Sequence, residues 1–61
     1  MSDKYKQIVE FVKNMETDVE KFYVKGQSAA GTRVRKALSE LRKMSQDMRN
    51  EVQDMKVQRK G

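Results

Sequence analysis

The chain of 61 residues contains no cysteine and no histidine. The first absence excludes a disulfide, and the two absences together exclude the usual zinc ligand sets. Without histidine or cysteine, catalysis would need carboxylates, lysines or a metal. We therefore expect a protein that is not an enzyme and holds neither metal nor cofactor. The acids of the first half show no metal-ligand spacing and lie among lysines: Glu10, Glu16, Asp18 and Glu20.

Proline is also absent and only three residues are glycine, whereas 38% of the residues are charged and 36% are hydrophobic. Few helix breakers and many charges are typical of long, solvated helices. There is no run of the roughly 18 apolar residues that a membrane span needs, and the first residues lack the apolar core of a signal peptide. The composition predicts an all-α cytoplasmic protein with no membrane span and no small-molecule substrate.

Apolar residues recur at alternating spacings of three and four along residues 3–24, which predicts an amphipathic helix with Ser2 or Asp3 as its N-cap. Three further apolar residues, Val9, Phe11 and Tyr23, widen the seam. A stripe of this width fits a helix bundle better than a two-stranded coiled coil. The seam itself consists of Tyr5, Ile8, Val12, Met15, Val19 and Phe22.

Residues 25–28 interrupt this pattern. Gly26 is suited to the left-handed position that ends a helix, Lys25 complements the helix dipole, and Ser28 is a natural N-cap for the next helix. A turn this short makes the two helices antiparallel neighbours. The second helix is expected over residues 29–56, followed by a short basic tail, 57–61. Its seam is formed by Gly31, Val34, Leu38, Leu41, Ser45, Met48, Val52 and Met55, bordered by Ala30, Ala37 and Met44.

A hairpin of 61 residues forms one domain, 1–61, and is too small to bury a sizeable core. Without disulfides or metals, oligomerisation is the remaining route to stability. We expect an all-α antiparallel hairpin that dimerises into a four-helix bundle, with a monomeric hairpin as the alternative. The residues predicted to form the core and the dimer contact are Ile8, Phe11, Val12, Met15, Val19, Phe22, Val34, Leu38, Leu41 and Met48.

Charge is distributed unevenly along the chain. Residues 1–28 contain five lysines and five acids, whereas residues 29–61 contain nine basic and four acidic residues, so the whole net charge of +5 lies in the second half. This asymmetry indicates a polyanionic partner, either nucleic acid or an anionic membrane surface. The aromatic residues lie on or beside the apolar seam, so we expect no base stacking. Binding to double-stranded DNA would be independent of sequence and dependent on salt.

The basic residues of the second helix form a line of their own. Arg35, Arg42, Arg49 and Lys56 repeat every seven residues, while Glu40, Asp47 and Asp54 form a separate acidic line. Such a sorted surface suits DNA phosphates, but a solvated face or charge pairing across a bundle would give the same pattern. The start of this helix is a second candidate, where Ser28 and Thr32 either add hydroxyl donors or only cap the helix and face solvent. Our candidate phosphate-binding residues are Lys25, Ser28, Arg33, Arg35, Lys36, Arg42, Lys43 and Arg49.

The segment from Lys25 to Lys36 (KGQSAAGTRVRK) resembles the turn of the bacterial histone H1-like family, which includes the chlamydial histone H1-like protein and shorter relatives in Bacteroidetes-type bacteria. Residues 37–43 and 49–51 also resemble the second helix of that family, so the likeness covers residues 8–56. It implies a nucleoid-associated protein that binds DNA without sequence preference and compacts it. The positions it marks are Lys25, Gly26, Ala29, Ala30, Arg33 and Arg35.

The chlamydial type continues into a long lysine-rich tail, whereas this sequence stops at Lys60-Gly61. We therefore expect each hairpin to bind weakly or mainly to oligomerise. Dimers with two basic edges would still gain affinity by effective concentration. Two other functions fit the same residues: a dimerising hairpin that recognises an acidic protein partner, and an amphipathic peripheral membrane binder.

Overall fold

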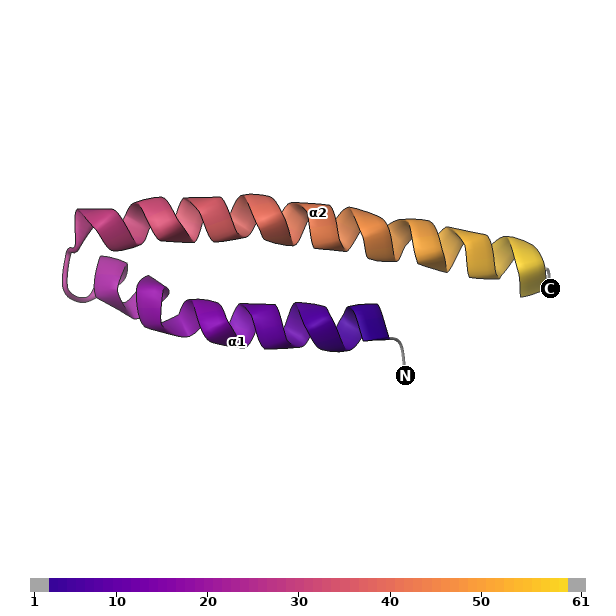
Figure 1. The fold of residues 1–61 in the computed structure, drawn as a ribbon, viewed down its shortest axis with the longest axis horizontal. Helices are drawn as coiled ribbons and strands as arrows, with labels where there is room; N and C mark the ends of the chain where they lie inside the picture. The colour runs from indigo at the N-terminus through magenta and orange to yellow at the C-terminus, as the bar shows by residue number, and fades with distance from the viewer. Residues whose placement is uncertain (1–2, 60–61) are drawn as a thin grey trace.

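The computed structural model describes residues 3–59, which form two α-helices, α1 (Asp3–Tyr23) and α2 (Ser28–Arg59). The helices run antiparallel and contact each other along their length (Figure 1). Among residues 3–59 there is no strand, so the predicted all-helical hairpin is confirmed. Residues 57–59, expected in a tail, continue α2. The predicted cap Ser2 and the last two residues, 60–61, lie outside the described residues.

The turn follows from the backbone freedom of one residue. Gly26 has a positive φ of 67°, and its N–H donates to the Phe22 carbonyl oxygen at 3.1 Å. This is the left-handed helix end that the sequence predicts. The cap of α2 differs from the prediction, because the Gln27 carbonyl oxygen accepts the N–H of Gly31 at 3.3 Å. Gln27 therefore occupies the N-cap position, and Ser28 is the first residue of the helix.

The helices approach most closely next to the turn. Ala30 has an exposed fraction of 0% and is the one fully buried residue among residues 3–59. At Gly31, an added Cβ atom would lie 2.6 Å from the ring of Phe22. The Phe22 ring therefore rests against the backbone of α2 at a position where only a hydrogen fits. The small size of Ala30 and Gly31 therefore permits the close approach of the two helices.

Replacing Gly31 by alanine is expected to lower the stability of the hairpin. A helix interior normally gains about 0.8–1.0 kcal/mol from this change, but the clash with the Phe22 ring costs about 1–3 kcal/mol. The net loss of about 1 kcal/mol corresponds to a Tm lowered by about 4–8 °C, measured by circular dichroism at fixed protein concentration. Thr32→Ala, at an exposed position of the same helix, serves as control and should leave the Tm unchanged or raised. A higher Tm for Gly31→Ala would contradict the close contact.

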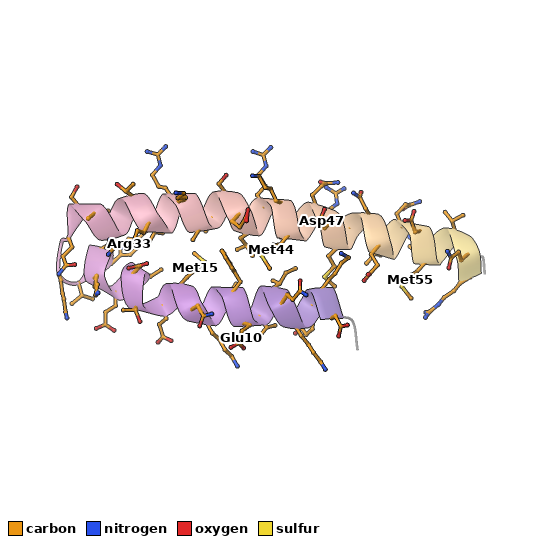
Figure 2. All side chains as sticks on the ribbon, in the orientation of Figure 1. Glu10, Met15, Arg33, Met44, Asp47 and Met55 are labelled. Carbon is orange, nitrogen blue, oxygen red and sulfur yellow. The ribbon has the colours of Figure 1, made fainter. Side chains whose placement is uncertain are left out.

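The contact layer between the helices is thin. Figure 2 shows Met15 of α1 and Met44 of α2 in the space between the two ribbons. Both side chains are only half-buried, as are their neighbours along the seam. The half-buried apolar residues that form this layer are Ile8, Phe11, Met15, Val34, Ala37, Leu41, Met44 and Met48.

Several residues expected in the core are exposed in the hairpin. The exposed fractions are 47% for Val12, 40% for Phe22 and 50% for Leu38. The reason is that each helix has apolar residues at three positions of every seven, and one partner helix covers only two of them. The third row, called here the apolar stripe, is Tyr5, Val12, Val19, Leu38, Ser45 and Val52; Val19 is half-buried, the other five are exposed, and Ser45 is the one polar member.

The molecule is a rod with Cα extents of 50 × 18 × 13 Å and a radius of gyration of 15.2 Å. A compact domain of this length would have a radius of gyration of about 10.5 Å. Because α2 has 32 residues and α1 has 21, α2 runs past the N-terminal end of α1 (Figure 1). Met55 lies in this overhang (Figure 2), and its side chain is 42% exposed. The hairpin alone therefore buries little apolar surface.

Candidate nucleic-acid interface

The surface of α2 that faces away from α1 carries positive charges and no carboxylate. Helix geometry places on it the residues farthest from the contact layer, and all of them are exposed. The acids of α2 lie elsewhere: Glu40, Asp47 and Asp54 follow one edge, and Glu51 is half-buried. The residues of this surface, called here the outer face, are Thr32, Arg35, Lys36, Ser39, Arg42, Lys43, Gln46, Arg49, Asn50, Gln53 and Lys56.

The outer face is ordered by the period of the helix. A separation of seven residues equals two turns, so Arg35, Arg42 and Arg49 follow one another at about 10.5 Å along the axis. Lys36 and Lys43 form a second line on the other border of the face. Uncharged hydrogen-bonding side chains, including Ser39 and Gln46, separate the two lines. The result is a continuous positive surface along a straight helix.

The candidate residue Arg33 occupies a different environment. Its Nε donates to Asp18 Oδ1 of α1 at 2.9 Å, and the two side chains are 49% and 31% exposed. This pair ties the helices together near the turn (Figure 2 labels Arg33). Among residues 3–59, the structure records no ion pair for Arg35, Arg42 or Arg49. Those three guanidinium groups are therefore available to an external anion.

Lys25 and Ser28, two further candidates, are exposed at the turn, at the end of the rod where α2 begins. They extend the outer face toward the helix N-terminus, whose partial positive charge also favours anions. Five of the eight candidate residues thus lie on the outer face, Lys25 and Ser28 are exposed at the turn where α2 begins, and Arg33 contacts α1.

The corresponding surface of α1 has no such sorting. Lys6 and Lys13 are interspersed with Glu10, Glu16 and Glu20, and all five are exposed. Figure 2 shows Glu10 on the side of α1 away from α2. The positive potential is therefore concentrated on α2, as the uneven distribution of charge along the sequence predicts.

Next to the seam predicted for the second helix, Arg35, Arg42 and Arg49 would border the contact with α1, whereas in the structure they lie farther out. The reason is that the contact layer uses Ala37 and Met44, which the sequence suggested as border residues. The missed members of the outer face are its uncharged residues, such as Gln46 and Gln53. The sequence pattern that could have identified them is that the positions three or four residues apart from Thr32 to Lys56 contain no acid.

Two shallow grooves lie on the side of the rod that carries the apolar stripe. One is lined by Phe22, Arg35 and Leu38 with their neighbours. The other joins Ile8 of α1 to Ser45, Arg49, Val52 and Lys56 of α2. A third groove, lined by Phe11, Arg33, Glu40 and Lys43, lies on the opposite side. The line of arginines therefore borders the apolar stripe, while the acidic edge lies away from it.

Residues 3–59 contain no group of three or more acids, cysteines or histidines arranged to hold a metal ion. No helix in this range is long and apolar enough to cross a bilayer. The chain matches the family model described as histone H1-like protein Hc1 over residues 2–58. Comparisons with curated proteins and with solved structures gave no significant match.

Proposed function

Because the chain belongs to the histone H1-like Hc1 family, we propose that it binds double-stranded DNA without sequence preference and compacts it in the bacterial nucleoid. The observation that carries this proposal is the outer face of α2, where six basic residues are exposed and no carboxylate competes with phosphate. A helix that only needed to be solvated would not exclude acids from one whole surface, because mixed charges keep a helix soluble. The family is a DNA-packaging family, and no enzymatic activity is proposed.

The proposed contacts are with the phosphate backbone. Arg35 and Lys56 are 21 positions apart, so the line of basic residues is about 32 Å long at a rise of 1.5 Å per residue. One turn of B-DNA is about 34 Å long, so a hairpin lying along the duplex presents its charges over about one helical turn. The hydroxyl and amide groups between the charges donate to phosphate oxygens. Because these contacts do not involve base edges, they carry no sequence preference.

We expect the form that compacts DNA to be a homodimer. Among residues 3–59 the hairpin buries one residue fully, Ala30, and it leaves most of the apolar stripe exposed. Small domains without disulfides or metals gain stability by association. Each subunit of a dimer would contribute one outer face.

A second candidate function is recognition of a protein partner without direct contact to DNA. The exposed apolar stripe favours it, because exposed apolar rows mark protein interfaces. This candidate predicts that the chain does not associate with duplex DNA at low salt, so the same binding measurement separates the two functions.

A salt titration tests the proposed function. If all six basic residues of the outer face contact phosphate, log K falls against log salt with a slope of about −5, so raising salt from 50 to 200 mM lowers affinity by about three orders of magnitude. Fluorescence anisotropy with three duplexes of unrelated sequence should give one common line. No binding at 50 mM salt, or a strong preference among the duplexes, would overturn the proposal.

A further inference from the structure

The apolar stripe is a continuous surface rather than two unrelated rows. In an antiparallel helix pair, the rows that flank the contact layer in the same way on both helices lie on the same side of the pair. The grooves support this placement, since Ile8 of α1 lines one groove together with Ser45 and Val52 of α2. The exposed fractions along the stripe are close to one half, at 46% for Tyr5, 47% for Val12 and 50% for Leu38.

The dimensions of the stripe side fit a protein partner. Both rows are present only where α1 lies beside α2, over 21 residues or about 32 Å, and with the 18 Å width of the rod this gives a projected area of roughly 570 Å². Stable protein interfaces begin at about 600 Å² on each partner. A second copy of the same rod matches this face in length and width, and one additional layer of helices would cover the third apolar row of both helices.

A two-fold pair can cover this face in two ways. With the symmetry axis along the rod, α2 of each copy lies on α1 of the other. With the axis across the rod, α2 lies on α2 and α1 on α1. The charges bordering the stripe distinguish these arrangements. On α2 the border is the line Arg35, Arg42, Arg49 and Lys56, whereas on α1 it is Val9, Glu16 and Tyr23.

We propose that the apolar stripe is the contact surface for a second copy of this chain, with α2 of each copy packed on α1 of the other. The opposite arrangement would place two lines of four positive charges side by side, which like-charge repulsion disfavours. This inference rests on the proposed function only for its DNA readout, because the packing itself needs no DNA.

The register of the hairpin adds a specific complementarity. The ion pair between Asp18 and Arg33 fixes which residues of the two helices lie at the same height along the rod. Because the helices are antiparallel, two residues back from Asp18 on α1 and two residues forward from Arg33 on α2 lie at the same height, so Glu16 lies at the height of Arg35. With the axis along the rod, the same height relates the two copies, so Glu16 lies beside Arg35 of the partner subunit. In this dimer the other five basic residues of the outer face remain for phosphate.

The arrangement determines how the dimer meets DNA. When α2 lies on α1 of the other copy, the two outer faces point to opposite edges of the bundle, so one dimer joins two duplexes. When α2 lies on α2, both outer faces merge on one edge and the dimer serves a single duplex. Joining of separate duplexes is therefore the functional consequence of the proposed packing.

A distance measurement on the free protein tests the packing. The chain has no cysteine, so Gln27→Cys, at the exposed turn, provides one labelling site per copy. With helix axes about 8–10 Å apart in a bundle, spin labels at the two turns should lie within about 20 Å of each other. In the other arrangement the turns lie at opposite ends of rods 50 Å long. A separation approaching that length, or a monomer in sedimentation, would overturn the proposal.

A matched pair of variants connects the packing to DNA. Val12→Glu places a charge in the stripe on α1 and leaves α2 unchanged, while Thr17→Glu adds the same charge at an exposed position of α1 outside the stripe. Val12→Glu should dissociate the dimer and abolish capture of a second, labelled duplex by an immobilised one, yet still bind single duplexes at low salt. Thr17→Glu should retain both activities. Full capture of the second duplex by Val12→Glu would contradict the proposed packing. If the unaltered chain did not bind single duplexes, the proposed function would be refuted instead.

Discussion

Replacing Arg42 and Arg49 together by glutamate is expected to weaken binding to every duplex by at least about 60-fold at 0.1 M salt. Each phosphate contact raises the affinity at 0.1 M salt about 8-fold over its value at 1 M salt, because log K changes by about 0.9 per contact for each tenfold change in salt. Two lost contacts give the factor of about 60, and the repulsion from two new carboxylates adds to it. The slope of log K against log salt should also fall in magnitude by about 1.8.

The matched control is Lys6→Glu combined with Lys13→Glu on α1. The two pairs have the same spacing of seven residues and the same change in net charge, so apart from the exchange of arginine for lysine they differ in the helix that carries them. Interactions beyond about 10 Å are screened at this salt concentration, and the rod is 18 Å across. The control should therefore lose only a few-fold in affinity. Equal losses would mean that binding follows net charge and that α2 has no special role.

Replacing Ala30 by glutamate is expected to unfold most of the protein at 25 °C. Ala30 is fully buried where the helices are closest, so the new carboxylate would have to lose its hydration or force the helices apart. An unpaired buried charge costs about 3–5 kcal/mol. A core of this size provides about the same amount of stability, so the variant should lose most of its helical circular dichroism signal.

Ala29→Glu is the control for this variant, because it introduces the same side chain one residue earlier at an exposed position. An acid in the first turn of a helix is favourable by about 0.3–1 kcal/mol, so Ala29→Glu should remain helical with an unchanged or higher Tm. If Ala30→Glu unfolded at the same temperature as Ala29→Glu, the close approach of the helices near the turn would not be needed for folding.

The features predictable from sequence are those that local chemistry determines. Gly26 ends α1 because the left-handed conformation is inexpensive only for glycine, and this property is independent of the rest of the fold. The two helices follow from apolar spacing and from the absence of proline. The N-cap of α2 is Gln27, one residue before the predicted Ser28, because the position of a cap depends on how the preceding turn closes.

The features that escaped prediction depend on how the two helices face each other. On α1, Ile8, Phe11 and Val12 are all apolar, so the spacing alone does not tell which two of the three rows meet α2. The predicted seam ran through Ile8 and Val12 with Phe11 beside it, all three were expected in the core, and the structure half-buries Ile8 and Phe11 while Val12 is exposed. The pair of Asp18 and Arg33 joins residues 15 positions apart, and it depends on a register that no local pattern contains.

The length of the rod has a consequence for how successive molecules occupy a chromosome. A rod of 50 Å laid along a duplex covers about 15 base pairs at 3.4 Å each. This footprint is close to one and a half helical repeats of about 10–10.5 base pairs. Neighbours placed end to end would therefore contact the double helix from nearly opposite directions, and a coated segment would present binding edges on two opposite sides.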